Sequence, residues 1–245
     1  MKKYSFIIGI LALFVFVGAS CITIGADKTG GDGGVYKSSD KGASWAQTNV
    51  LPTEQGIGTI NAVNVVDLVL DPQDNGAIYL ASAGSGLFYT WDGTSSWKYV
   101  NGLGSGYVNS LAIDHSNKCV LYAAVQNKIW KSVDCARSWK SYYFDTRDGV
   151  YVSYLAVDAA DNKILYAGLS MGDLLKSIDG GMSWSTIKRF NNKVQKIMLH
   201  PKNTNIVFVA LQNNGLWKSN NKGLKWTSLS EKMRDFGGAN EIYDL

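Results

Sequence analysis

The stretch that decides the fold is KSIDGGMSW, residues 176–184. An aspartate beside two glycines suits a catalytic carboxylate, a metal ligand or a turn, because glycine adopts positive φ and aspartate binds nearby amides. Related phrases return as KSSDKGASW, YTWDGTSSW, KSVDCARSW and KSNNKGLKW. The tryptophans that end the five copies are spaced 52, 42, 45 and 42 residues apart along the chain. This period predicts a repeat architecture.

A second phrase recurs between the tryptophans, for example VNSLAIDHSNKCVLYAA (108–124) and VSYLAVDAADNKILYAG (152–168). Each copy joins two short alternating apolar runs across a polar turn, which is typical of antiparallel strands. A short run such as IWKS forms a third strand, and a fourth strand begins at the tryptophan. Four strands in about 40 to 45 residues predict an all-β protein, a β-propeller of four-stranded blades.

The repeats do not add up to a closed ring. Residues 34–48 supply only the last two strands of a first blade, and four complete blades follow to about residue 230. The final NEIYDL (240–245) resembles only the opening of a first strand, as in NVVDLVL. Propellers remove exposed edges by closure. We therefore expect an open, C-terminally truncated arc of a larger propeller; the alternative is a complete five-bladed ring with a defective last blade.

The SxDxGxxW phrase resembles the Asp-box of BNR repeats. This motif is shared by sialidases, sortilin-type ectodomains, the photosystem II stability and assembly factor family, and propeller glycoside hydrolases that act on xyloglucan. Two copies, around Asp40 and Asp179, match in full. In other copies Thr94 and Ala136 replace the glycine, and Asn221 replaces the aspartate. The resemblance implies a propeller over the whole chain after its leader, without assigning it to one of these subfamilies.

We expect the repeated carboxylates to shape turns and not to catalyse a reaction. A catalytic carboxylate would occur once or as a converging pair, whereas this one recurs in every blade and asparagine can replace it. Its oxygen would accept backbone N–H groups, and each tryptophan would bury its ring between neighbouring blades. The residues in this structural role are Asp40, Trp45, Asp92, Trp97, Asp134, Trp139, Asp179, Trp184, Asn221 and Trp226.

The N-terminus has the pattern of an export signal. MKKYS is followed by the apolar FIIGILALFVFVG and by ASC, in which Cys21 follows two small residues. We expect residues 1–21 to be a signal peptide with a lipobox, Cys21 to carry lipid, and residues 22–33 to form a glycine-rich tether before a propeller at 34–245. Because Gly18 stands where the lipobox prefers an aliphatic residue, cleavage without lipid and an uncleaved anchor remain alternatives. The predicted location is the cell surface or periplasm.

The two remaining cysteines fall in the third repeat. Cys119 opens the second strand and Cys135 lies in the turn after the third strand. Because these strands form a hairpin, folding brings residue 119 opposite residue 134 or 135. Disulfides persist in exported proteins. We predict a disulfide between Cys119 and Cys135, with two free buried thiols as the alternative.

Composition and motifs exclude several classes of function. A formal charge of +4 over 245 residues, without a basic run, argues against a nucleic-acid partner. His115 and His200 are the only histidines and fall in turns of different blades, so no metal site is expected. The glycine-rich stretches lack the lysine and helix of a phosphate loop. We predict no cofactor.

The loops that cross from one blade to the next carry a candidate binding patch for a protein partner. Three of the four arginines fall in crossings 140–150, 185–193 and 227–240, together with aromatic residues. Arginine and aromatic residues are enriched at interface hot spots. The alternative is that these side chains are solvated or pack their own loops, and Asp145 and Asp148 beside Arg147 suggest local ion pairing. The predicted patch consists of Tyr142, Tyr143, Phe144, Arg147, Lys188, Arg189, Phe190, Arg234 and Phe236.

The sequence therefore favours a non-catalytic binding or assembly scaffold at the cell envelope. The alternative is a carbohydrate-active propeller, either a glycan-binding lectin or a glycosidase related to sialidases or xyloglucanases. A sialidase needs a tyrosine nucleophile with a glutamate partner, and this chain has three glutamates and lacks the early arginine of that family's first blade. Other glycosidases use two carboxylates across a cleft, a pair that this sequence does not offer.

Overall fold

The computed structural model describes residues 33–233. The main elements are four antiparallel sheets of four strands each, which we call blades A to D in chain order. Blade A has β5 (Val65–Asp71), β6 (Asp74–Ser82), β7 (Leu87–Thr90) and β8 (Lys98–Tyr99); blade B has β9 (Val108–Ile113), β10 (Leu121–Val125), β11 (Lys128–Ser132) and β12 (Lys140–Phe144). Blade C has β13 (Val152–Val157), β14 (Leu165–Leu169), β15 (Asp173–Ser177) and β16 (Ser185–Arg189); blade D has β17 (Val194–Leu199), β18 (Val207–Leu211), β19 (Gly215–Ser219) and β20 (Thr227–Ser228).

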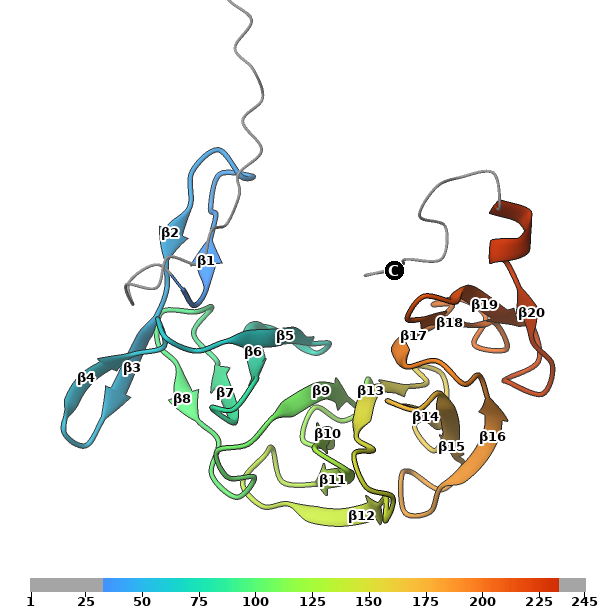
Figure 1. The fold of residues 1–245 in the computed structure, drawn as a ribbon. Helices are drawn as coiled ribbons and strands as arrows, with labels where there is room; N and C mark the ends of the chain where they lie inside the picture. Colours follow the sequence, from blue (N-terminus) through green and yellow to red (C-terminus); the bar gives the residue numbers. More distant parts are fainter. Residues whose placement is uncertain (1–32, 234–245) are drawn as a thin grey trace, which may run out of the picture.

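The four blades stand side by side around an arc (Figure 1). The first strand of each blade, β5, β9, β13 and β17, lies on the inside of the arc, and the fourth strand lies on the outside. The repeat analysis predicted this β-propeller of four-stranded blades, and the structure confirms it. Within residues 33–233 the only helix is the short 3-10 turn at Ser230–Met233, and none there has the length and apolarity to cross a membrane.

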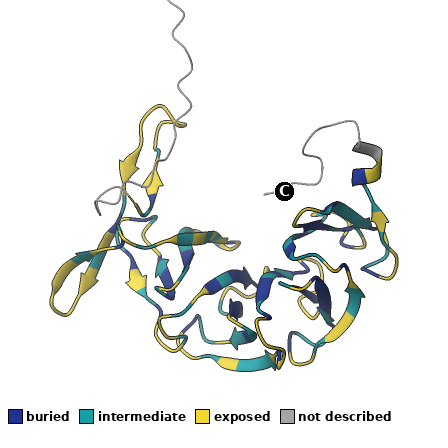
Figure 2. Ribbon diagram, in the orientation of Figure 1, coloured by how far each residue is buried: buried dark blue, intermediate teal, exposed yellow. Residues whose placement is uncertain are grey.

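Two smaller sheets precede blade A. Strands β1 (Tyr36–Lys37) and β2 (Ala46–Gln47) pair with each other, at the partial blade that the sequence indicates. Strands β3 (Val50–Thr53) and β4 (Gly56–Thr59) form a hairpin where only a crossing loop was expected. This hairpin is largely exposed (Figure 2), so it lacks the alternating apolar pattern by which the other strands were found.

The hydrophobic core is divided among the junctions between blades. Between blades B and C, for example, Tyr122 and Ile129 pack with Val152 and Leu165. Trp97 is fully buried, and the tryptophans at the matching positions of blades B, C and D are half-buried against the core. Each therefore supports a junction by covering apolar surface.

Trp45 differs from the other four tryptophans. It is 64% exposed, contrary to the expectation that every ring is wedged between blades. In the described chain its sheet has only the two short strands β1 and β2, which leave no broad apolar face for an indole to cover.

The turn between the third and fourth strands is held by side chains, as Asp179 shows. The Ser177 hydroxyl donates to Asp179 Oδ1 at 2.8 Å and accepts the Gly181 N–H at 2.9 Å. Asp179 Oδ1 also accepts the Ser183 N–H at 2.9 Å. Hydrogen bonds from Ser183 and Ser177 lower the pKa of Asp179 to about 2. Asn221 accepts a backbone N–H at the same place in blade D, which explains why an amide can replace the carboxylate.

Two structural constraints favour glycine at position 181 of this turn. Gly181 has φ of 82°, and an added Cβ would lie 2.7 Å from a ring carbon of Tyr122 in the preceding blade. Thr94 and Ala136 adopt φ of 83° and 64° at the matching positions, so the local backbone imposes this conformation even on residues that disfavour it. Cys119 and Cys135 form a disulfide across the matching turn region of blade B.

Several sequence predictions lie outside the described residues. These are the signal peptide and its Cys21, the tether up to residue 32, the NEIYDL segment, Arg234 and Phe236.

Candidate functional site

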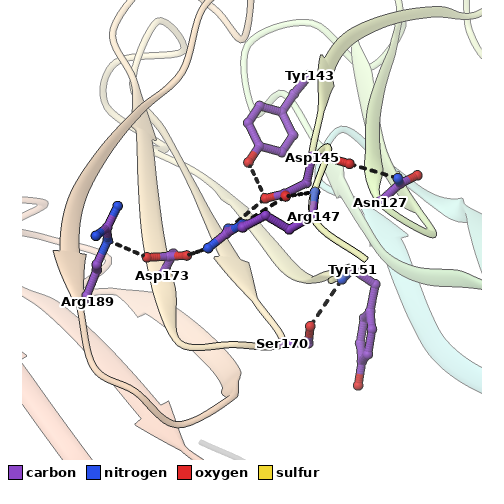
Figure 3. Close-up of polar contacts among 8 residues, drawn as sticks. All are labelled: Asn127, Tyr143, Asp145, Arg147, Tyr151, Ser170, Asp173 and Arg189. Carbon is purple, nitrogen blue, oxygen red and sulfur yellow. Dashed lines mark hydrogen bonds and ion pairs between the residues drawn. The ribbon is translucent and has the colours of Figure 1, made fainter. Parts of the chain in front are cut away.

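Part of the predicted binding patch is an ion-pair network between blades B and C (Figure 3). Arg147, in the crossing after β12, donates from Nε and Nη2 to both oxygens of Asp145, at 3.0 and 2.7 Å. Its Nη1 donates to Asp173 at the start of β15, at 2.6 Å. Arg189, at the end of β16, contacts the other oxygen of Asp173 at 3.0 Å. The two arginines thus converge on one carboxylate, and Arg147 pairs with Asp145 and Asp173, not with Asp148.

The carboxylates of this network are buried and the guanidinium groups are not. Asp145 and Asp173 are 5% and 4% exposed, whereas the side chains of Arg147 and Arg189 are 48% and 73% exposed. Hydrogen bonds from Arg147 hold the pKa of Asp145 at about 2. Burial raises the pKa of Tyr143, and its hydrogen bond to Asp145 raises it further. The network therefore keeps the buried Asp145 carboxylate ionised and gives Asp173 two cationic partners.

The other described members of the patch differ in exposure. Phe144 is 54% exposed, and Tyr142 is half-buried with the Lys140 ammonium 5.1 Å from its ring centre. Phe190 is 7% exposed and belongs to the core between blades C and D, so its assignment to a partner surface is wrong. Phe190 directly follows β16, and it fills the junction because its ring packs against two tryptophans there.

The network positions the loop that follows β12. The carbonyl of Asp145 accepts a hydrogen bond from Asn127 in the β10–β11 hairpin at 2.9 Å, and Tyr151 N–H donates to Ser170 in the β14–β15 turn at 3.1 Å (Figure 3). Asn127 and Tyr151 also line a pocket at the centre of the propeller. Arg147 therefore acts on that pocket indirectly, by fixing the loop that forms part of its wall.

The central pocket has a volume of about 910 Å³ and is lined by the beginnings of inner strands from all four blades. Asp67 comes from β5, Asn109 from β9, Tyr154 from β13 and Lys196 from β17. Loops on a rigid scaffold complete the wall, which is where binding residues concentrate in many folds.

The sequence contains a signal for this pocket that the repeat analysis missed. Asp67, Ser110, Tyr154 and Lys196 all pair with the same repeat position of the second strand, opposite Ala81, Ala124, Gly168 and Ala210. A polar residue stands at that position in every blade, and three of the four line the pocket. Ser110 is instead buried and accepts the Leu155 N–H, and its neighbour Asn109 lines the pocket. Because inner strands surround the axis, such residues converge there, even though they are about 40 residues apart in sequence.

Burial sets the electrostatics of the pocket. It raises the pKa of Asp67, an effect that the positive charge of Lys196 opposes. Burial also raises the pKa of Tyr154 to about 12, with the negative charge of Asp67 adding to the shift. A carboxylate, a phenol and an ammonium from three blades therefore influence one another within this pocket.

Two more tyrosines face the same pocket. Tyr107 is 57% exposed, and the Lys193 ammonium lies 5.4 Å from the centre of the Tyr151 ring, within the range of a cation–π contact. With the amide side chains of Gln126 and Gln195, the pocket offers flat aromatic surface together with neutral donors and acceptors. Such a lining suits a polar ligand with apolar faces, such as a peptide or a saccharide.

A second, more apolar pocket of about 330 Å³ lies on the opposite face, and both histidines line it. His200 Nδ1 accepts the N–H groups of Lys202 and Asn203 at 3.2 Å each, so this ring shapes its own turn. Within residues 33–233 no three histidine, cysteine or acidic side chains gather in a way that could hold a metal. Asp67 is the single carboxylate among the described residues that line the central pocket.

The chain matches no protein-family model. Two curated proteins resemble parts of it. A probable oligoxyloglucan-reducing end-specific xyloglucanase of Neosartorya fischeri is 33% identical over 70 residues, covering 28% of this chain and 8% of that protein. A xyloglucanase of Hypocrea jecorina is 27% identical over 164 residues, covering 55% of this chain and 19% of that protein. The chain thus spans less than a fifth of the curated relatives that it matches.

Solved structures share the fold. An ancestral GH74 enzyme superposes with a TM-score of 0.61 at 20% identity, covering 75% of this chain and 26% of that one. YCF48 from Cyanidioschyzon merolae superposes with a TM-score of 0.53 at 10% identity, covering 67% of this chain and 56% of that one. At these identities the likeness shows a propeller fold common to enzymes and to YCF48.

Proposed function

We propose that the protein is a propeller of the Asp-box type that works as a non-catalytic binding scaffold and holds a protein partner at its central pocket. The observation that carries this proposal is the meeting of Asp67, Tyr154 and Lys196, from three blades, in an open pocket of about 910 Å³. Tyrosine supplies large rigid contact area and is enriched in interface hot spots. The fixed loop beside Arg147 gives the partner a preformed wall, which lowers the cost of ordering on binding.

Photo-crosslinking tests the site. The full-length protein would carry p-benzoylphenylalanine in place of Tyr151, which lines the pocket, or in place of Ile178, which is 71% exposed in a turn on the opposite face. Both proteins would be irradiated in an envelope extract. We expect a discrete crosslinked product at position 151 and none of that mass at position 178. Equal products at both positions, or none at 151, would contradict the assigned face.

The location of this scaffold is also a proposal. The leader supports export, lipid on Cys21 and attachment to a membrane at the cell surface or periplasm. Metabolic labelling with a palmitate analogue tests it: wild type should be labelled and Cys21→Ala should not. Label on the Cys21→Ala protein, or none on wild type, would contradict lipid attachment at this residue.

A carbohydrate-active propeller is the second candidate. The likeness to xyloglucanases and the aromatic lining of the central pocket favour it. Against turnover stands the single carboxylate among the described lining residues, because glycosidases of the common types use two. A glycan array with a hydrolysis assay on fluorogenic glycosides distinguishes the two proposed functions. Turnover would refute the non-catalytic scaffold. Glycan binding without turnover would identify the ligand of a non-catalytic site as a saccharide.

A further inference from the structure

The blades are joined by a recurring lysine contact. At three junctions, a lysine of the third strand donates its ammonium to a backbone carbonyl in the turn of the next blade. These contacts are Lys37 to Gly93 at 2.7 Å, Lys131 to Gly180 at 2.7 Å and Lys176 to Lys222 at 3.0 Å.

Three kinds of group surround the ammonium at the junction of blades B and C. The centre of the Tyr122 ring lies 5.4 Å from Lys131 Nζ, and the Tyr122 hydroxyl donates to the Gly180 carbonyl at 3.0 Å. Burial lowers the pKa of Lys131, and the carboxylates of Asp114 and Asp179 oppose that shift. The ammonium thus sits among an aromatic ring, a carbonyl and a carboxylate, which together compensate its desolvation.

The next junction repeats the arrangement. Lys176 Nζ lies 5.5 Å from the centre of the Tyr166 ring, and the Tyr166 hydroxyl donates to the Lys222 carbonyl at 3.1 Å. Burial lowers the pKa of Lys176, and the negative charge of Asp158 opposes that shift, as Asp114 does for Lys131. The site is therefore a feature of the repeat.

The junction of blades A and B has the equivalent ring, carbonyl and carboxylate residues but lacks the lysine. Tyr89 pairs with Tyr79 in the register in which Lys131 pairs with Tyr122, so a tyrosine occupies the lysine position. In the aligned repeats, Tyr79, Asp71 and Cys135 stand at the positions of Tyr122, Asp114 and Gly180, which supply the ring, the carboxylate and the carbonyl at the next junction. The Tyr89 ring stacks on Tyr79, with centroids 6.2 Å apart. A pocket of about 480 Å³, lined by Asp71, Tyr79, Tyr89 and Cys135, lies at this junction.

Two polar groups of this pocket, the Asp71 carboxylate and the Tyr79 hydroxyl, can form further hydrogen bonds. Asp71 is 4% exposed, and the described chain gives it one hydrogen bond, from the Gln73 N–H to Oδ1 at 2.8 Å. The Tyr79 hydroxyl makes none within residues 33–233, unlike the matching hydroxyls of the next two blades. A buried carboxylate normally has either a charged partner or several hydrogen bonds.

The cations at this pocket, Lys118 and Arg137 in its lining and Lys98 beside it, contact other groups than Asp71 and Tyr79. Lys118 pairs with Asp74 at 3.3 Å. Arg137 donates to the Asp134 carbonyl at 3.4 Å. Trp91 is 52% exposed, and its ring lies 5.2 Å from that of Tyr89 at an angle of 43°, so the aromatic surface extends to solvent. The Lys98 ammonium lies 4.1 Å from the centre of the Trp91 ring.

We propose that this pocket binds an alkylammonium group supplied from outside the chain, which takes the place that Lys131 and Lys176 fill at the neighbouring junctions. Its ligand is either a lysine side chain of another protein or a small free amine. The pocket lies on the face of the hairpin turns, opposite the central pocket, so the inference does not depend on the proposed function.

The test uses Nα-acetyl-lysine methylamide as the ammonium probe and Nα-acetyl-norleucine methylamide as its uncharged counterpart, titrated against the full-length protein by NMR. Tyr89→Lys supplies the ammonium from the chain itself and should weaken binding of the lysine probe at least tenfold. Tyr89→Phe keeps the ring without adding a charge and should bind like wild type. Asp71→Asn should weaken binding by about tenfold, because one charge-assisted contact is worth ~1.5 kcal/mol.

Thermal unfolding of each variant checks that it is folded, and Tyr89→Lys reproduces a contact already present at three junctions. Butylamine compared with a lysine-containing peptide separates the two sources: similar affinity indicates a free amine, and much tighter peptide binding indicates a protein lysine. Unchanged binding by Tyr89→Lys, equal binding of the norleucine probe, or binding of a neutral saccharide at Trp91 in preference to the lysine probe would overturn the proposal.

Discussion

Removing Arg147 should destabilise the protein far more than removing Arg189, although both arginines contact Asp173. Arg147 makes three side-chain hydrogen bonds to two carboxylates that are about 95% buried. Arg189 makes one contact, and its side chain is 73% exposed. Arg147→Ala therefore leaves the buried Asp145 without its cation and Asp173 with Arg189 alone, whereas Arg189→Ala leaves both carboxylates paired with Arg147.

The expected sizes follow from this difference. Breaking a buried ion pair costs about 3–5 kcal/mol, and we take about 3 for Arg147→Ala because its guanidinium is 48% exposed. An exposed pair contributes about 0–1 kcal/mol, the expectation for Arg189→Ala. In a domain of this size about 1 kcal/mol shifts Tm by roughly 2–4 °C. Arg147→Ala should lower Tm by about 6–12 °C and Arg189→Ala by less than about 4 °C.

Acid titration adds an independent check. Arg147 holds the pKa of Asp145 at about 2, below the usual 3.8. A depressed carboxylate pKa stabilises the folded state above the usual value, and this contribution is lost as pH falls from 3.8 towards 2. Urea unfolding of wild type and Arg147→Ala should therefore differ most near neutral pH and converge in this acidic window. Equal losses for the two arginine variants, or a difference independent of pH, would refute the reasoning.

Three further predictions concern the turns. Asp179→Ala should lower Tm more than Asp179→Asn, because the amide oxygen of Asn221 accepts the equivalent backbone N–H in blade D. Equal losses would show that the acceptor oxygen is unimportant. Gly181→Ala should cost about 1–3 kcal/mol in urea unfolding, because of its φ of 82° and the Tyr122 ring, and a neutral result would contradict the close approach. Thiol counting on the exported protein should find Cys119 and Cys135 unreactive until reductant is added, whereas two reactive thiols in the unfolded, unreduced protein would rule out the disulfide.

The strands and blades could be predicted because each repeat encodes them locally. Alternation of apolar residues marks both strands around Leu111 and Tyr122, and the turn phrase marks the end of the third strand. The β3–β4 hairpin could not be found in this way, because its exposed strands carry no alternation. The exposure of Trp45 escaped prediction for a related reason: burial of a ring depends on what its neighbours offer, not on the motif that contains it.

The sites depended on long-range placement and were harder to predict. Arg147 was assigned to a binding surface, yet its partner Asp173 is 26 residues away and visible only in the folded chain. Phe190 looked like a loop residue but faces the core. The replacement of lysine by Tyr89 is visible in the aligned repeats. The sequence alone does not show that the lysines at this position in other blades bind a carbonyl in the turn of the next blade, so it could not indicate a vacant ammonium site.

The most direct test of the central claim, that the central pocket binds without reacting, is a product assay on xyloglucan and related β-glucans. Purified full-length protein and Asp67→Asn would be incubated with each polysaccharide, and released oligosaccharides would be counted by chromatography. The account predicts no release above the blank by either protein. Release by wild type that disappears in Asp67→Asn would contradict it and make Asp67 a catalytic residue.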